Sequence, residues 1–421
     1  MMKFSKAYSI TAAAALMCAS GGAYAFDVTT GDWKFSANGE INVDYVFSSC
    51  EGASSAKPIV TVGGACTGSA SGSSVSNIGN GLLPAALVFG VATTQEGFDI
   101  AAHFGLYPGI STNDGGSPNL QQGAPAGTNV ALGTTGLDVR QVYMTFGNKD
   151  IGTFSLGRNF GLFGYDAIIN DMTLPGVGVA GGLSGSSPAN TSLGSIGFGY
   201  IYCDTLGQIN YTTRDFAGFN ATLGIFDPIN SLTAPGTSEP KTSPGFHGKL
   251  TYTYAFNKGT KLYLSSAFLD QSQKYEIGTT PYSYNGFGID ATAKLDIDAF
   301  QALAYYYHGS GLGTTGLFVL SDDGLGHKRG SDGYLVQGTY TIKKLKLGVN
   351  YGVSRLDYAN GADAAAVPNL LKSNNKITGG AYYSLTKNLT LLGEVSDVDT
   401  KAHNDTSNRS ANFNVGAFLS F

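Results

Sequence analysis

Apolar and polar residues alternate strictly over residues 33–47, and this is the feature that most restricts the fold of the chain. One row of the segment consists of Trp33, Phe35, Ala37, Gly39, Ile41, Val43, Tyr45 and Phe47. The other row consists of Lys34, Ser36, Asn38, Glu40, Asn42 and Asp44. A period of two residues places the rows on opposite faces of a β-strand, one apolar and one in contact with water. Residues 411–421 repeat the pattern at the other end of the chain.

Similar alternation recurs in between and predicts 16 strands in all. The expected strands span 33–47, 82–94, 97–107, 137–147, 151–159, 204–214, 218–226, 246–256, 260–269, 284–295, 299–308, 333–343, 345–355, 376–385, 388–397 and 411–421. The two strands at 137–147 and 151–159 alternate poorly, so the direction in which their side chains point stays open.

The links between these strands differ in length in a regular way. Short links such as 148–150, 257–259 and 386–388 take turns with long Gly-, Ser- and Asn-rich links. The long links are 48–81, 108–136, 160–203, 227–245, 270–283, 309–332, 356–375 and 398–410. Short periplasmic turns that alternate with longer outside loops are typical of antiparallel transmembrane β-barrels, and a soluble sandwich has no need of this rhythm.

The first 25 residues have the features of a secretory signal peptide. Lys3 and Lys6 precede a short apolar core, and Ala23-Tyr24-Ala25 forms a cleavage site before Phe26. Cys18 raises the alternative of a lipoprotein signal, although Met17 stands where a small residue is expected. The mature chain would be residues 26–421.

The mature chain holds no run of about 20 apolar residues, so no transmembrane helix is predicted. An exported chain of this kind is either a soluble protein or a barrel. A strand in lipid must pair every backbone group, and only a closed barrel has no unpaired edge. Apolar rows would then meet outer-membrane lipid and polar rows the lumen. With about 16 strands the lumen is too wide for side chains to fill, so it holds water.

Composition and motifs argue against several other functions. Loss of Lys3 and Lys6 takes the formal net charge from −5 to −7, which does not suggest a nucleic-acid partner. The five histidines lack metal-ligand spacing, and no nucleophile elbow, P-loop or dinucleotide fingerprint is present. We therefore predict no catalytic residue, no metal and no cofactor.

Residues 136–227 resemble the general bacterial porin family, the trimeric 16-stranded kind. The resemblance rests on Val139-Arg140, on the stretch from Ile151 to Gly161 with its Gly157-Arg158-Asn159, and on Tyr165-Asp166-Ala167, Met172 and Leu174-Pro175. Ile209 to Phe216 extends it, and the terminal Phe421 matches the signal read by the barrel-assembly machinery. The resemblance implies an outer-membrane location in a Gram-negative bacterium and a homotrimer.

In that family the third outside loop folds into the lumen and its acidic residues face arginines on the wall. By resemblance, loop 160–203 narrows the pore, Asp166 and Asp171 line it, and Arg140 and Arg158 lie opposite. The alternatives are arginines solvated elsewhere in the lumen and aspartates that form turns or caps. Three places depart from the family pattern: the stretch Pro84-Ala85-Ala86-Leu87 and the position near Leu206 lack an expected basic residue, and Gly176 replaces the usual glutamate.

Two further carboxylates, Glu40 and Asp44, are candidates for the lumen, either at the narrow zone or in a wide vestibule. Together with Asp166 and Asp171 they outnumber Arg140 and Arg158, which predicts a weak preference for cations. Cys50 and Cys66 share the first outside loop in an oxidising compartment, so they form a disulfide or remain two free thiols. Cys203 has no predicted role.

The prediction for function is a water-filled channel through which small hydrophilic solutes and ions diffuse passively across the outer membrane. Two alternatives stay open: a substrate-selective channel with an aromatic track for sugars, and a non-conducting structural or adhesin barrel with a plugged lumen.

Overall fold

The computed structural model describes residues 26–51, 58–66, 74–110, 137–180, 191–231, 237–238 and 241–421, and the predicted signal segment lies outside them. In chain order its elements are β1 (Phe26–Thr30), β2 (Trp33–Glu51), β3 (Val75–Gly79), β4 (Ala86–Gln95), β5 (Phe98–Pro108), β6 (Leu137–Asn148), β7 (Gly152–Phe160), α1 (Tyr165–Asn170), β8 (Thr205–Thr212), β9 (Phe219–Phe226), β10 (Thr237–Ser238), β11 (Gly245–Ala255), β12 (Thr260–Ile277), β13 (Thr280–Ile297), β14 (Phe300–Ser310), β15 (Gly330–Ile342), β16 (Leu345–Leu356), α2 (Gly361–Ala366), β17 (Leu371–Ser384), β18 (Leu389–Ala402) and β19 (Ser407–Ser420). Within these ranges, no helix is long and apolar enough to cross a membrane.

The sheet closes on itself. Three of its 19 strands, β1, β3 and β10, are short additions, and the remaining sixteen pair with their neighbours in antiparallel order. The last of them, β19, pairs with β2 from Ser420–Glu40 to Arg409–Glu51, which completes the ring. The predicted all-β, 16-stranded barrel is therefore confirmed. The short strands β1 and β3 were not predicted; both pair with β2, at its start and in its second half.

The alternating rows face as the sequence predicts. On β2, Phe35, Ile41 and Tyr45 are exposed on the outside, whereas Asn42 and Asp44 are buried on the inside. An outer surface of large apolar side chains fits contact with lipid, where each strand must pair its backbone groups with its neighbours.

The poor alternation of 137–147 has a structural cause. Strand β6 carries one more residue than β5 between the pairs Tyr107–Asp138 and Gly105–Gln141, which is a β-bulge. The bulge reverses the direction of alternation, so Val139 and Met144 both face outward although one has an odd and one an even number.

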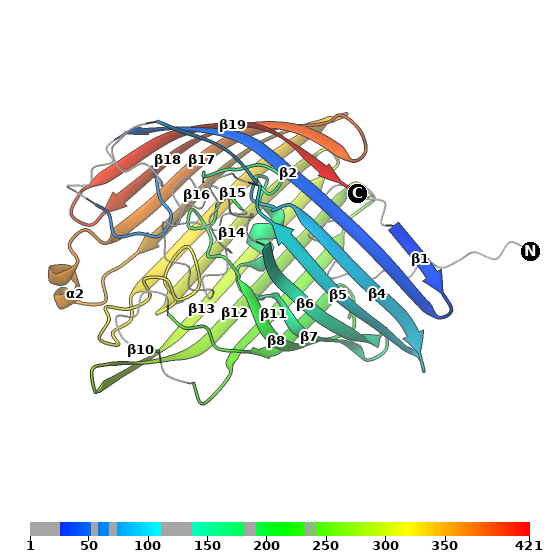
Figure 1. Ribbon diagram of the computed structural model, residues 1–421, viewed down its shortest axis with the longest axis horizontal. Helices are drawn as coiled ribbons and strands as arrows, with labels where there is room; N and C mark the ends of the chain where they lie inside the picture. Colours follow the sequence, from blue (N-terminus) through cyan, green and yellow to red (C-terminus); the bar gives the residue numbers. More distant parts are fainter. Residues whose placement is uncertain are drawn as a thin grey trace, which may run out of the picture.

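The two ends of the barrel differ as expected. In Figure 1, α2 and β10 lie at the end with the long loops, and the hairpin of β1 lies at the opposite end with the short turns. One expected loop was wrong: residues 270–283 continue β12 and β13 as a long hairpin, with Ile277 paired to Thr280. The sequence 270–283 contains enough strand-forming residues to extend the ladder beyond the wall.

Candidate functional site

The third long loop, of which the structure describes residues 161–180 and 191–204 (loop 3 below), leaves the wall after β7 and enters the lumen. Its short helix α1 lies near the middle of the barrel (Figure 1). Asp166 of α1 forms an ion pair with Lys249 of β11 at 3.3 Å and accepts a hydrogen bond from the Tyr263 hydroxyl of β12 at 3.0 Å. At the other end of α1, Lys294 of β13 donates to the side chain of Asn170 at 2.9 Å. These contacts hold α1 against the β11–β13 side of the wall.

Asp171, directly after α1, organises the loop itself. One carboxylate oxygen accepts hydrogen bonds from the backbone and hydroxyl of Thr173 and from Asn350 of β16. The other accepts the Ser195 N–H at 3.1 Å and the Tyr200 hydroxyl at 3.0 Å. With every lone pair in use and only 3% of its surface exposed, Asp171 acts on the pore through the shape of the loop.

The far part of loop 3 is held by two buried charges on neighbouring strands. Glu394 of β18 accepts hydrogen bonds from the N–H groups of Val177 and Gly178, at 2.9 and 2.8 Å. Lys376 of β17 donates to the Gly194 carbonyl and the Ser195 hydroxyl. The Glu394 carboxylate thus binds the loop at residues 177–178, and the Lys376 ammonium binds it at residues 194–195.

The glycine at 176 has a physical reason in this arrangement. A Cβ atom at this position would lie 2.2 Å from a carboxylate oxygen of Glu394. The glutamate expected at position 176 from the family resemblance would therefore collide with Glu394 of the wall.

The inward row of β16 fits loop 3 closely. Successive inward positions of this strand meet the loop in pairs: Gly348 with Met172, Asn350 with Asp171, Gly352 with Phe198, and Ser354 with Gly199. The two glycines let the loop approach the wall and the two polar residues bond to it, so β16 serves as the seat of the loop.

Among the described residues, loop 3 and its neighbours cover mainly the β12–β18 side of the lumen. Inward residues nearer the loops on β12–β18 are almost inaccessible, as Leu269 (0%), Asn350 (1%) and Glu394 (1%) show. Segment 311–329, between β14 and β15, contributes Leu312, Leu317 and Phe318 to the same buried cluster. On β5–β9 and β11, by contrast, many inward residues are partly exposed: Ala101, His103, Gln141, Thr145, Ser155, Asn159, Thr212, Asn220, Thr222, Lys249 and Thr251. We call β5–β9 with β11 the open wall.

Arg140 lies at the edge of the open wall, where the bulge of β6 turns it inward. Its Nε is 3.1 Å from the Asp138 carboxylate, and its guanidinium stacks over the Tyr107 ring at 4.8 Å. It also donates to the hydroxyl of Tyr202, in loop 3, at 3.4 Å. Arg140 thus joins the wall to the returning arm of loop 3, with its charge already paired.

The predicted role of Arg158 at the constriction is not supported. Arg158 is exposed and pairs with Gly207 of β8, which is outward-facing, in the same row as the exposed Ile209. The inward neighbour is Asn159, which accepts from Gln141 at 2.9 Å. Arg158 lies two residues after Leu156 and therefore on the same face of the strand. This spacing is the sequence feature that could have predicted an outward Arg158.

Glu40 and Asp44 lie in the inward row of β2, and neither carboxylate reaches open water. Both are buried, and Asn42 between them donates to the carbonyls of Leu83 and Pro175. Residues 80–85 and loop 3 therefore cover this part of β2. Both carboxylates lie beneath the covering segments.

The structure shows the state of the three cysteines that follow the predicted signal segment. Cys50 and Cys66 form a disulfide with Cα atoms 5.2 Å apart, which is the first of the two alternatives left open by the sequence. Cys203 is a free thiol, fully buried at the end of loop 3. The described ranges contain no group of three or more His, Cys, Asp or Glu side chains placed to hold a metal ion.

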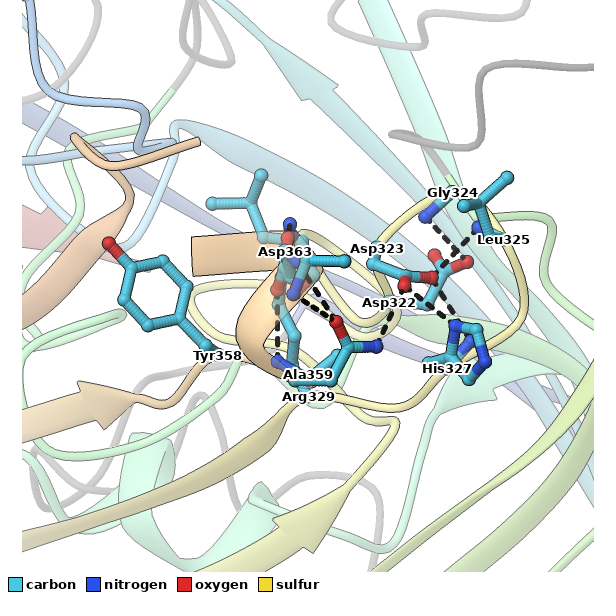
Figure 2. A network of polar contacts seen from close by, with 12 residues as sticks. Asp322, Asp323, Gly324, Leu325, His327, Arg329, Tyr358, Ala359 and Asp363 are labelled. Atoms are coloured by element: carbon cyan, nitrogen blue, oxygen red, sulfur yellow. Dashed lines mark hydrogen bonds and ion pairs between the residues drawn. The ribbon is translucent and has the colours of Figure 1, made fainter. Parts of the chain in front are cut away.

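Outside loops are locked together at the mouth by a second polar network (Figure 2). Arg329 forms two hydrogen bonds with Asp363 of α2, at 2.8 and 2.6 Å. Asp323 accepts from the backbone of Leu325 and from His327, and Asn360 at the start of α2 donates to it. This network fixes segment 311–329, which covers the lumen, to the loop that carries α2.

Sequence reasoning missed most of the residues that hold loop 3. Lys249, Lys294, Lys376, Asn350 and Glu394 all lie in polar rows of predicted strands. Their row shows that they point inward, but no local signal distinguishes a lysine that meets the loop from one that meets water.

A closed antiparallel barrel with an apolar outer surface, a loop folded into its lumen and a half-open polar wall defines a channel-forming outer-membrane β-barrel. The chain belongs to the Gram-negative porin family, whose model matches residues 12–403. It is accordingly an outer-membrane channel for passive diffusion, and the members of this family and fold are channels rather than enzymes.

Solved structures agree with this fold at low identity. The outer membrane channel DcaP of Acinetobacter baumannii is 15% identical with a TM-score of 0.67, over 93% of this chain and 99% of that chain. The anion-selective porin from Comamonas acidovorans is 13% identical with a TM-score of 0.57, over 92% and 100%. Salmonella typhi OmpF, in a complex with daunomycin, is 13% identical with a TM-score of 0.53, over 94% and 100%. A comparison with curated proteins finds no sequence match.

Proposed function

We propose that solutes pass between loop 3 and the open wall, and that the channel admits small hydrophilic solutes without strong specificity. The observation that carries this is the uneven cover of the lumen: inward side chains nearer the loops on β12–β18 are buried, while many of those on β5–β9 and β11 are partly exposed. A polar, water-accessible wall in a 16-stranded barrel supports passive diffusion.

The test is conductance in a planar bilayer together with swelling of liposomes in sugars. Purified protein should give ohmic current steps, and pentoses should enter faster than disaccharides. A barrel that inserts, as judged by protease protection, but gives neither current nor swelling would contradict the proposal and favour the plugged, non-conducting alternative.

We further propose that loop 3 and Arg140 set a narrow zone of almost balanced charge. The predicted cation preference rested on four carboxylates, of which Glu40, Asp44 and Asp171 are buried away from the open wall. The fourth, Asp166, is paired with Lys249, and Arg140 is paired with Asp138. Lys294 donates to a neutral amide and so keeps an unbalanced positive charge beneath α1.

This arrangement supports weak selectivity with a slight preference for anions, a direction that the anion-selective Comamonas relative shares. Reversal potentials across a salt gradient should be slightly on the anion side in the wild type, and Lys294→Met should move them toward cations. A clear cation preference of the wild type would contradict the proposal, because fixed charges in a narrow pore act strongly on permeant ions.

A substrate-selective channel is a second candidate, favoured by aromatic rings beside the same zone. The Tyr165 ring of α1 lies 4.5 Å from the Lys249 ammonium, and His103 and Tyr143 stack at 4.7 Å on the open wall. Rings near cations can hold the faces of sugars or aromatic solutes. Saturable block of the ionic current by one sugar, and not by its isomers, would favour this function.

We propose a homotrimer in which Arg158 lies at a subunit contact. A charged side chain on a lipid-facing wall costs about 2–4 kcal/mol at the membrane centre and less near the interfaces, so a protein partner is a better environment for it. The known trimer form of Vibrio cholerae OmpT, a similar fold, agrees. Arg158→Leu should reduce the trimer band on mild gels, whereas Leu156→Ala in the same row is the control.

The remaining partners follow from the chain ends and are proposals too. Residues 1–25 would be removed on export, and the mature N-terminus read by sequencing would be Phe26. The terminal Phe421 bonds to Gly39 through its backbone while its ring stays exposed, which supports recognition by the barrel-assembly machinery. We expect no enzymatic activity.

A further inference from the structure

Helix α1 presents an apolar face that the packing of loop 3 does not fully cover. Tyr165 and Ile169 lie four residues apart, on the same side of the helix, and both are partly exposed. Ala167, on the opposite side of the helix, is fully buried. Because α1 lies near the middle of the barrel (Figure 1), this face offers solutes an apolar contact inside an otherwise polar lumen.

A lysine without a carboxylate partner lies at the end of this face. Lys294 of β13 donates to the side chain of Asn170, the residue after Ile169, at 2.9 Å. Among the described residues this neutral oxygen is its only hydrogen-bond partner, and Asp296, two positions along β13, accepts from Gln301 instead. An ammonium group has three N–H donors, so Lys294, which is partly exposed, can still bind an anion from the lumen.

The carboxylate of α1 is already neutralised. Asp166 pairs with the Lys249 ammonium at 3.3 Å and accepts a hydrogen bond from the Tyr263 hydroxyl at 3.0 Å. The Lys249 ammonium also lies 4.5 Å from the centre of the Tyr165 ring. Tyr263 pairs in register with Lys294, whose ammonium lies 5.9 Å from the centre of the Tyr263 ring. The charge of Lys294 therefore stays unbalanced, and aromatic rings lie beside both ammonium groups.

The six residues that form this cluster, called the α1 site below, are all partly exposed. They are Tyr165, Ile169, Asn170, Lys249, Tyr263 and Lys294. Nearer the outside loops the same strands are closed, since Leu269 of β12 and Asp290 of β13 are buried. Lys249 belongs to the open wall, so the α1 site borders the passage proposed above.

We propose that the α1 site binds small aromatic carboxylates on their way through the channel. This rests on the diffusion function proposed above and adds one preferred solute class to it. The solute carboxylate accepts a charge-assisted hydrogen bond from Lys294, and its ring packs on Ile169 and beside the Tyr165 ring. A solute without a ring leaves the apolar face in water, and a solute without a charge leaves Lys294 unpaired. Both parts of the solute therefore contribute to binding.

The experiment measures block of the ionic current in a planar bilayer by sodium benzoate, with acetate and benzamide as matched probes. We expect saturable block by benzoate at a concentration about tenfold lower than by acetate, because the ring adds apolar contact. Benzamide, which has the ring without the charge, should not block. Raising the salt from about 0.1 M to about 1 M should weaken the block, since salt screens partly exposed charges.

Two variants separate the contributions of the charge and of the apolar face. Lys294→Met removes the cation and keeps an apolar stem, so the half-blocking concentration of benzoate should rise about tenfold. Ile169→Thr should raise it about threefold and leave the value for acetate unchanged. The matched control is Lys346→Met on β16. Lys346 is also a partly exposed inward lysine beside a ring, 4.7 Å from the centre of the Tyr382 ring, but it lies outside the α1 site. This control should keep the wild-type value.

The outcomes distinguish the α1 site from the channel itself. A wild type that conducts but is blocked no better by benzoate than by acetate would overturn the site and leave the diffusion function standing. Equal weakening of the block by Lys294→Met and Lys346→Met would also overturn it, because the effect would then be one of general charge. If Lys294→Met does not insert, the comparison of benzoate, acetate and benzamide on the wild type decides. Absence of wild-type conductance would contradict the diffusion function, and the site with it.

Discussion

The carbonyl oxygen of Phe198 in loop 3 occupies the space that a side chain at Gly352 of β16 would fill: a Cβ atom there would lie 1.8 Å from this oxygen. The contact leaves no room for adjustment because Leu335 closes the other side at 3.2 Å. The position of loop 3 therefore depends in part on the lack of a side chain at residue 352.

Gly352→Val should displace loop 3 from its seat on β16. Overpacking of this kind costs about 1–3 kcal/mol, and the loop can relieve it by moving into the lumen. We expect a lower melting temperature and altered conductance. Gly338→Val on the adjacent strand is the control, because the nearest atom to a Cβ there is 3.8 Å away; if both variants behave alike, the seat has no effect on the loop.

Asp171→Asn should affect the order of loop 3 and leave ion selectivity almost unchanged. The substitution turns an acceptor of five hydrogen bonds into a group whose N–H₂ faces donors, at a cost of about 1–3 kcal/mol. Single-channel recordings should show larger open-channel current fluctuations. A quiet channel with a marked shift of reversal potential toward anions would instead show that Asp171 faces the permeant ions.

Asp166→Asn should shift selectivity toward anions. It removes the negative partner of Lys249, whose ammonium lies at the edge of the open wall and then acts uncompensated on permeant ions. The reversal potential across a salt gradient measures the shift, and Asp166→Asn/Lys249→Met should return it close to the wild-type value. Equal reversal potentials in all three proteins would exclude this pair from the ion path.

Arg329→Met should loosen the outside loops of Figure 2, because it leaves the buried Asp363 carboxylate without its cation. Breaking a buried ion pair costs about 3–5 kcal/mol, and here the cost falls on loop docking. Protease should cleave segment 311–329 faster in the folded barrel. Arg355→Met is the control, since its pair with Asp332 is largely exposed; equally fast cleavage there would contradict the prediction.

Acid should loosen the same loops in the wild type. Burial alone would raise the pKa of the Asp363 carboxyl, but the hydrogen bonds and charge of Arg329 and the Ala359 N–H hold it below its ordinary value. A depressed pKa contributes stability that is complete above the unfolded-state pKa of about 3.9 and is lost as the pH falls through the folded-state value. Cleavage by an acid-active protease should therefore accelerate only below about pH 4, and acceleration near neutral pH would point to another group.

Much of the fold could be predicted because lipid and water impose a period of two on every strand. That rule placed Phe35 outside and Asp44 inside, and applied to Leu156 and Arg158 it would have placed Arg158 outside as well. The bulge between Asp138 and Gln141 was not predictable from alternation, because one extra residue reverses the direction of the side chains and no residue type marks the place. The residues that hold loop 3 were even harder to predict, because Glu394 and Lys376 contact residues 217 and 181 positions away in the chain.

The one-sided cover of the lumen divides the barrel into two regions that should tolerate change very differently. Along β12–β18 the inward row packs like the interior of a soluble domain, so substitutions there disturb loop 3 and segment 311–329, which pack on it. Along β5–β9 and β11 many inward residues are partly exposed, and those without a partner in loop 3 can be exchanged at little cost to the fold. Changes in the range of solutes that the channel admits should therefore arise by substitutions in the open wall. The opposite wall, which holds loop 3 in place, should change less.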